Sequence, residues 1–273
     1  MKTLLLIPLL ILCHSSAWAN ELERFETLFG ELLKQYRSPP KMIHGIQTVA
    51  FDFNSLAEDS KAQDSLFART LEAFERTDLS VLGTADEKKA FWINAYNLGA
   101  MKLVVESYPI RSIRDQKVSK GGYPWSKPLV GVSGRRLSLE GIEQDKLLKY
   151  FKDPRLVFAV NCATISCPDL PPVPFRAEDL DSQLDALMKD FLSNPTKGLQ
   201  INRETGEIQI SWIFEKHKDL IAKHFGGLPG VVHRYLDDET CQWFEEHGAH
   251  VTVSYLEHDW TLNDTALEGS TAP

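Results

Sequence analysis

One segment constrains the fold more than any other: residues 84–109, TADEKKAFWINAYNLGAMKLVVESYP. Thr84 and Glu87 form a capping box that predicts the start of a helix, and Pro109 predicts its end. Over 90–105 the residues are apolar almost all the way round the helix. A helix of this kind is buried on every side, so we expect it in the middle of the domain with the other elements packed around it.

Two asparagines interrupt this apolar segment. At 100° per residue, Asn94 and Asn97 share one stripe of the helix surface with Glu87 and Met101. A buried amide without a partner costs about 1–3 kcal/mol, so each asparagine needs hydrogen bonds. The two amides either hold neighbouring loop backbone or form one wall of a polar cleft, and the sequence leaves both interpretations open.

The rest of the chain predicts more helices than strands. We expect helices over 21–37, 63–76, 139–151, 177–192 and 211–226, a strand over 155–161, a β-hairpin over 199–211 and a terminal strand over 250–255. Strands and helices do not alternate regularly, which favours an α+β fold: a mostly helical single domain around a small, largely antiparallel sheet. We expect this domain to span 20–264 and the polar tail 265–273 to be disordered.

The N-terminus predicts a secreted protein. A positively charged start is followed by the apolar run 3–13 and by small residues that end at Ala19, which is the pattern of a signal peptide over 1–19. Its apolar core is too short for a permanent span, which needs about 20 residues, and no later segment is apolar enough. We therefore expect no membrane span and a location in the bacterial periplasm, with Asn20 and Glu23 capping the new first helix.

The charge of the chain argues against one class of partner. The formal net charge is −8, and removal of the signal peptide takes away one more lysine. Proteins that bind nucleic acid need a basic face that neutralises phosphates, so we do not expect nucleic acid as a partner.

Two cysteines lie five residues apart in LVFAVNCATISCPDLP, residues 156–171. Outside the cytoplasm such thiols usually pair, and a disulfide that closes so short a loop contributes about 2 kcal/mol. Cys162 also follows a predicted buried strand, which is a rigid place to hold a nucleophile. A structural disulfide between Cys162 and Cys167 and a reactive Cys162 both stay open. Cys241 is the third cysteine of the mature chain and leaves an odd thiol.

We expect no metal and no cofactor. Structural zinc sites usually combine two pairs of ligands, whereas the spacing here is Cys-x4-Cys with no second pair. The same spacing is too long for the Cys-x2-Cys redox motif. Neither a glycine-rich phosphate loop nor a Gly-x-Ser-x-Gly elbow is present in the sequence.

A carboxylate stands out in the predicted helix 139–151. Glu143 lies near the centre of its apolar face, so it must be paired, hydrogen-bonded or protonated. An ion pair with Lys146, three residues later, is one interpretation, and a role in an acid/base site is the other.

Four blocks of the sequence together resemble one known family. FWINAYN at 91–97, IE at 142–143, FAVNCATISCPDL at 158–170 and HDWTLND at 258–264 look like DUF547, a family of unknown function that occurs in bacterial secreted proteins and in plants. The order of the blocks also matches, and they frame about 170 residues.

The resemblance selects particular positions. They are Trp92, Asn94, Tyr96, Asn97, Glu143, Asn161, Cys162, Cys167, Pro168, Asp219, Asp259, Trp260 and Asn263. The chain departs from the family at Gln144, where the family usually has histidine directly after the matched glutamate. If that histidine is a base, this member lacks it; in a binding pocket, glutamine can replace its hydrogen bonds.

Three hypotheses for function follow. The first is a polar cleft that binds a small polar ligand, a peptide or a glycan, beside a redox-sensitive Cys162–Cys167 loop; its ligand-binding residues would be Asn94, Tyr96, Asn97, Asn161 and Trp260.

The second is a cysteine-dependent hydrolase or acyltransferase. Cys162 would be its nucleophile, Glu143 or a histidine its base, and the amides of Asn94 or Asn161 its oxyanion donors. The third is a structural or partner-binding protein without a ligand site.

Overall fold

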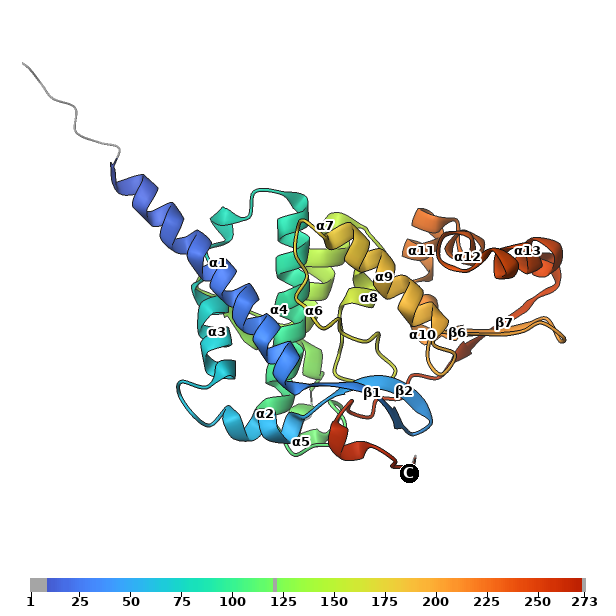
Figure 1. Ribbon diagram of the computed structural model, residues 1–273, viewed down its shortest axis with the longest axis horizontal. Coiled ribbons are helices and arrows are strands. Elements are labelled where there is room, and N and C mark those ends of the chain that lie inside the picture. The colour runs from blue at the N-terminus through green and yellow to red at the C-terminus, as the bar shows by residue number, and fades with distance from the viewer. Residues whose placement is uncertain (1–8, 120–121, 272–273) are drawn as a thin grey trace, which may run out of the picture.

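The central element of the fold is the buried helix α4 (Ala85–Val105). The computed structural model describes residues 9–119 and 122–271 (Figure 1). Thr84 and Glu87 form the expected capping box, and almost every side chain of α4 from Ala90 onward is buried. At Gly99 a Cβ atom would lie 2.8 Å from Leu139, so glycine lets the Leu139 side chain approach α4 closely. The predicted central helix is confirmed.

Helices of the N-terminal third cover one side of α4. They are α1 (Leu9–Tyr36), α2 (Phe53–Asp59) and α3 (Leu66–Arg76), followed by the short turn η1 (Leu79–Val81). The rings of Phe25, Phe74 and Phe91 join α1, α3 and α4 with centroids 5.3 to 6.2 Å apart. The helices predicted over 21–37 and 63–76 are therefore confirmed.

The first helix begins earlier than expected. Because α1 starts at Leu9, Asn20 lies inside the helix of the uncleaved chain and is not its N-cap. Residues 1–8, the first part of the predicted signal peptide, lie outside the described residues. Within the described part of the chain, no helix is long and apolar enough to cross a membrane.

A hairpin and the C-terminal segment lie side by side. Strands β1 (Arg37–Ile43) and β2 (Ile46–Phe51) pair antiparallel, and His44 and Gly45 both have positive φ in the turn between them. Residues 265–271, expected to be disordered, instead form the turn η5 (Thr265–Leu267) and hydrogen-bond to β1 and its turn. The expected tail is thus ordered up to 271, because Leu267 packs against the core.

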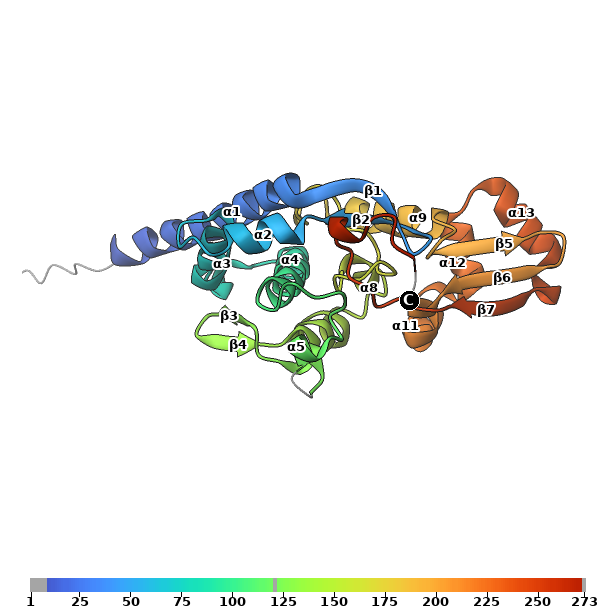
Figure 2. The same cartoon turned by 90° about the horizontal axis from the view of Figure 1, so that it is seen from below.

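The middle of the chain folds under α4 (Figure 2). It contains α5 (Gln116–Ser119), η2 (Pro124–Ser126), the hairpin β3 (Val130–Val132) and β4 (Arg135–Leu137), and then α6 (Leu139–Gly141), the π-helical η3 (Ile142–Leu148) and α7 (Lys149–Phe151). The last three form one continuous helical segment with Ser138 as N-cap, so the helix predicted over 139–151 is confirmed. Its π-helical stretch changes which side chains face inward, a feature frequent at functional sites.

The strand predicted over 155–161 is wrong. Residues Leu156–Ala159 form a short helix, α8, and the backbone is extended only from Val160. Arg155 holds the start of α8 through Asp153, Asp181 and Asp185, at 2.7 to 3.1 Å. The run is apolar because α8 lies between two apolar clusters, and a short apolar run does not distinguish a strand from a buried helix.

The C-terminal third forms the second apolar cluster around a three-stranded sheet. Its elements are α9 (Leu180–Ser193), β5 (Leu199–Asn202), β6 (Glu207–Ser211), α10 (Trp212–Lys216), α11 (Lys218–Phe225), α12 (Leu228–Tyr235), α13 (Asp238–His247), η4 (Gly248–His250) and β7 (Thr252–Leu256). The predicted hairpin β5–β6 is confirmed, and β7 adds to β6 in parallel. Together these elements make the expected single α+β domain with small, mainly antiparallel sheets.

Candidate functional site

The two asparagines of α4 hold loop backbone. Asn94 Nδ2 donates to the carbonyl of Phe175 at 2.8 Å, and its Oδ1 accepts from the Phe175 N–H at 3.0 Å. Asn97 Nδ2 donates to the carbonyl of Ala159 at 2.9 Å, and its Oδ1 accepts from the Asn161 N–H at 2.8 Å. Both side chains are fully buried. Of the two interpretations left open by the sequence, loop anchoring describes these contacts.

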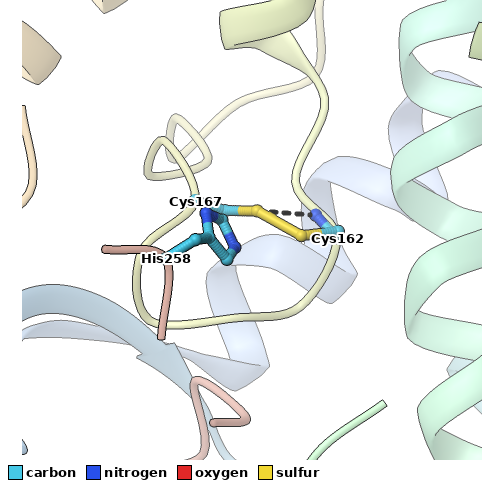
Figure 3. A group of neighbouring side chains, drawn as sticks. All are labelled: Cys162, Cys167 and His258. Atoms are coloured by element: carbon cyan, nitrogen blue, oxygen red, sulfur yellow. Dashed lines mark hydrogen bonds between the residues drawn. A yellow bond between two sulfur atoms is a disulfide. The ribbon is translucent and has the colours of Figure 1, made fainter. Parts of the chain in front are cut away.

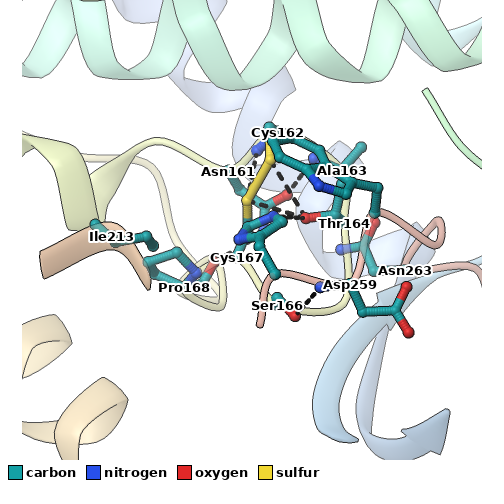
Figure 4. The surroundings of a disulfide bond; sticks show 12 residues. Asn161, Cys162, Ala163, Thr164, Ser166, Cys167, Pro168, Ile213, Asp259 and Asn263 are labelled. Carbon is teal, nitrogen blue, oxygen red and sulfur yellow. Dashed lines mark hydrogen bonds between the residues drawn. A yellow bond between two sulfur atoms is a disulfide. The ribbon is translucent and has the colours of Figure 1, made fainter. Parts of the chain in front are cut away.

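Asn161 continues this arrangement into the cysteine loop. Its Nδ2 donates to the carbonyl of Pro168 at 2.7 Å, and its Oδ1 accepts from the Ala163 N–H at 2.7 Å (Figure 4). The side chain therefore ties the two ends of the loop together. Ala163 itself has a φ of 63°, a left-handed conformation that these bonds hold in place.

The loop brings its two cysteines together. The sulfur atoms of Cys162 and Cys167 lie at disulfide-bonding distance, with the Cα atoms 6.4 Å apart (Figure 3). The Cys162 N–H donates to Cys167 Sγ at 3.3 Å. Thr164 Oγ1 lies 3.3 Å from Cys162 Sγ, 3.2 Å from Cys167 Sγ and 3.0 Å from His258 Nε2. A single hydroxyl thus contacts both sulfurs and an imidazole.

The segment HDWTLND runs alongside the cysteine loop. The Ile165 N–H donates to the Thr261 carbonyl at 2.9 Å, and the Asp259 N–H donates to Ser166 Oγ at 2.9 Å. The blocks at 158–170 and 258–264, separated by almost a hundred residues, therefore meet in space (Figure 4). This pairing brings His258 and Trp260 to the disulfide.

A cavity of about 140 Å³ opens beside the disulfide, between the two apolar clusters. It is lined by Tyr96, Arg114, Tyr123, Trp125, Glu143, Val157, Val160, Cys162, Cys167, Trp212, Ile213, Lys216, His217, His258 and Trp260. The structure thus brings together five of the residues predicted for a site: Tyr96, Glu143, Cys162, Cys167 and Trp260. Asn94, Asn97 and Asn161 do not line the cavity; Asn97 and Asn161 hold the backbone of the cysteine loop behind its wall, whereas Asn94 holds Phe175, beyond that loop.

Five aromatic side chains line the cavity: Tyr96, Tyr123, Trp125, Trp212 and Trp260. The ring of Trp260 lies 4.2 Å from that of His258, 5.5 Å from that of Trp125 and 6.0 Å from that of Trp212, between centroids. The guanidinium carbon of Arg114 stacks 3.5 Å above the Trp260 ring. Within residues 9–119 and 122–271, no carboxylate lies within ion-pair distance of Arg114.

Glu143 lines the cavity beside Lys216 and His217. Its Oε1 is 3.4 Å from Lys216 Nζ and 3.9 Å from His217 Nε2. The ion pair with Lys146, one of the two interpretations left open by the sequence, does not form: Lys146 Nζ lies 5.6 Å from the centroid of the Trp92 ring. Burial, and to a smaller degree the nearby Glu143 carboxylate, raises the pKa of the Tyr96 hydroxyl.

The two histidines of the cavity are held neutral. Burial, followed by the charge of Lys216, lowers the pKa of His217 to about 4. Burial, followed by the charges of Arg114 and Lys216, lowers the pKa of His258 to about 4. His258 Nε2 contacts Thr164, whereas its buried Nδ1 has no hydrogen-bond partner among the described residues.

Three metal-ligating side chains converge at this point. The sulfurs of Cys162 and Cys167 and a ring nitrogen of His258 lie within 4.8 Å of one another (Figure 3). The sequence predicted no metal because it offered no second ligand pair close to Cys-x4-Cys. His258 is remote in the chain and joins the cysteines only through the pairing described above.

The sequence also missed several wall residues, among them Arg114, Trp125, Trp212 and Lys216. One signal was available: Trp125 lies in a proline-rich loop and Trp212 directly follows a strand, positions where a large aromatic has no evident core to fill. Gln144, where the resembled family usually has histidine, lines an adjacent surface hollow together with Asp219, Lys216 and His217. Its Nε2 donates to Glu143 Oε1 at 3.3 Å, so the departure at 144 acts on the disulfide cavity only through Glu143.

Comparison with known proteins gives one match. No curated protein and no solved structure matches the chain significantly. Residues 80–192 match the family model described as "Protein of unknown function, DUF547". The matched segment contains α4, Glu143 and the cysteine loop, and the match supports the resemblance to DUF547 drawn from the sequence.

Proposed function

We propose that the cavity is a site of thiol–disulfide exchange, in which the Cys162–Cys167 disulfide reacts with a small thiol or with a cysteine of a peptide. The observation that carries this proposal is the position of the disulfide: its sulfurs form part of the wall of a preformed cavity with aromatic and cationic neighbours. Pockets with an apolar wall and a few convergent polar groups are the usual sites of ligand binding.

The two sulfurs are suited to different roles. Cys162 is partly exposed, whereas Cys167 is 4% exposed. An incoming thiolate would bond to Cys162 Sγ while the Cys162–Cys167 bond breaks and its electron pair goes to Cys167 Sγ. The Cys162 N–H and the Thr164 hydroxyl, which contact Cys167 Sγ, stabilise the resulting thiolate.

The rim of the cavity favours an anionic reactant. Arg114 and Lys216 are both exposed, and Arg114 is free of carboxylate partners among the described residues. A carboxylate would pair with Arg114 while the thiol enters the cavity. The volume of about 140 Å³ has room for about five waters, at about 30 Å³ each, and so for a small thiol or one side chain.

The proposed setting is outside the cytoplasm. The pattern of residues 1–19 is that of a signal peptide, and disulfides persist in oxidising compartments such as the periplasm. There the protein would exchange electrons with thiols of other secreted molecules.

The hydrolase hypothesis has less support. The oxyanion donors expected for it, the amides of Asn94 and Asn161, donate to the carbonyls of Phe175 and Pro168. A nucleophilic Cys162 also requires prior reduction of the disulfide. Thiol–disulfide exchange, in contrast, starts from the oxidised Cys162–Cys167 bond.

Trapping of the mixed disulfide tests the proposal. In Cys167→Ser, Cys162 has no resolving partner, so incubation with oxidised glutathione should give a stable adduct of one glutathione on Cys162, measured by intact mass. The matched variant Cys162→Ser retains only the buried Cys167 and should react much more slowly. Cys241→Ser in both backgrounds removes the third thiol of the mature chain. Equal adduct formation by the two variants would refute the proposal.

A second comparison tests whether carboxylates on the reactant speed the reaction. Cystamine, the disulfide of cysteamine, has the same reactive S–S bond as oxidised glutathione but carries two amines and no carboxylate. Cys167→Ser should therefore react faster with glutathione disulfide than with cystamine, and added salt should reduce the difference because rim charges are screened.

A further inference from the structure

The disulfide cavity contains a ligand set that the exchange reaction does not use. Two sulfurs and one imidazole nitrogen lie within 4.8 Å of one another. Two thiolates and one histidine, with a fourth position open to substrate or water, are one of the ligand sets of catalytic zinc sites. The cavity next to the disulfide provides such an open position.

Zinc and the disulfide exclude each other. Zn–S bonds of about 2.3 Å in a tetrahedron place two sulfur ligands about 3.7 Å apart, so two bonded sulfurs cannot hold the ion. Reduction of the disulfide by a dithiol breaks the S–S bond and delivers two electrons and two protons, while the dithiol becomes a disulfide. Zinc then displaces the two thiol protons.

We propose that the reduced protein binds one Zn²⁺ through Cys162 Sγ, Cys167 Sγ and a ring nitrogen of His258, with the fourth position facing the cavity. This inference rests on the part of the proposed function that makes the disulfide reducible. Exchange with an external disulfide oxidises the two thiolates to the Cys162–Cys167 disulfide, reduces the external disulfide to two thiols and releases the ion.

The surroundings of the three ligands support this assignment. The asparagine contacts of the loop use no sulfur atom, so they hold the backbone of Cys162 and Cys167 in both redox states. Thr164 Oγ1 contacts both sulfurs and His258, and a hydroxyl there can orient metal ligands from the second coordination shell. Two thiolates neutralise the charge of Zn²⁺, which suits a largely buried site.

Zinc titration of the full chain tests the inference. The protein is reduced with a phosphine, freed of reductant without air and titrated with Zn²⁺ against a chromophoric chelator. Reduced protein should bind one equivalent and oxidised protein none at this site. His258→Ala should weaken binding by more than about tenfold. His217→Ala removes the other histidine of the cavity and should leave the zinc affinity unchanged.

The absorption spectrum of Co²⁺ bound to the unmutated, reduced protein gives an independent test of the ligands. Two thiolates and an imidazole around Co²⁺ should give thiolate charge-transfer absorption and the intense visible bands of a tetrahedral site. A weak octahedral spectrum, equal zinc binding by reduced and oxidised protein, or equal losses in the two histidine variants would overturn the inference. Because these measurements contain no thiol substrate, their failure is distinguishable from a failure of mixed-disulfide trapping.

Discussion

Replacement of Asn97 by leucine tests whether this buried amide both stabilises the protein and slows reduction of the Cys162–Cys167 disulfide. Asn97 lies on the buried helix α4 and bonds to the Ala159 carbonyl at 2.9 Å and to the Asn161 N–H at 2.8 Å. Leucine has a similar shape but makes neither bond. The change therefore leaves one buried carbonyl and one buried N–H without partners at the base of the loop.

The expected loss of stability follows from these two groups. Each unsatisfied backbone group costs about 1–3 kcal/mol, and the added apolar burial returns about 1–2 kcal/mol. The net loss should be about 1–4 kcal/mol, which lowers the melting temperature by about 2–16 °C for a chain of this size. The protein should stay folded, since domains have about 5–15 kcal/mol of stability.

The matched control is Asn94→Leu. Asn94 makes the same two kinds of bond from the same helix, but to Phe175, beyond the cysteine loop. Both variants should lose similar stability in urea titrations. Only Asn97→Leu should speed reduction of the disulfide by dithiothreitol, by about tenfold for each 1.4 kcal/mol that appears as local opening of the loop. A loss below about 1 kcal/mol, or equal reduction rates in the two variants, would refute this reasoning.

Three further predictions concern the disulfide, pH and the rim. Cys162→Ser and Cys167→Ser should each lower the free energy of unfolding by about 2 kcal/mol in urea, and unequal losses would argue against a shared bond. Because the pKa of His217 falls to about 4 in the folded protein, its contribution to stability is complete above its usual pKa of 6.5 and is lost as the pH falls toward 4, by up to about 3 kcal/mol. His217→Gln should flatten this part of the pH–stability curve, and an unchanged curve would contradict the assignment. Arg114→Gln should slow the reaction of Cys167→Ser with oxidised glutathione by about tenfold but not that with cystamine, measured by intact mass over time.

The sequence predicts well where local signals decide the structure. The capping box at Thr84, the N-cap at Ser138 and the hairpin turn at Gly206 each act within a few residues, and all three elements form as expected. It fails at α8, where an apolar run is consistent with either a strand or a buried helix. Asp153 accepts the Arg155 N–H in the turn before that helix, a contact that an apolar-run pattern does not include.

In the candidate site, too, local signals predict some features and long-range contacts decide the others. Asn94 and Asn97, polar residues inside an apolar helix, indicated the part of the molecule that contains the cavity, although neither side chain lines it. The aromatic wall depends on contacts such as Trp125 with Trp260, more than a hundred residues apart. The resemblance selected both blocks, 158–170 and 258–264, but it does not show that they lie side by side. The approach of His258 to the sulfurs depends on the bridge between Thr164 and Leu262. No spacing rule within one segment contains that information.

The buried amides have a consequence for the proposed thiol–disulfide exchange. Asn97 and Asn161 fix the backbone of the loop through bonds that do not involve sulfur, so reduction breaks one covalent bond without releasing the chain. The two thiols then stay near each other at a high effective concentration, which favours closure of the disulfide over reaction with a second thiol. The same constraint keeps both sulfurs available to one metal ion. Asn97→Leu should therefore make the disulfide easier to reduce at equilibrium and weaken zinc binding by the reduced protein, whereas Asn94→Leu should change neither.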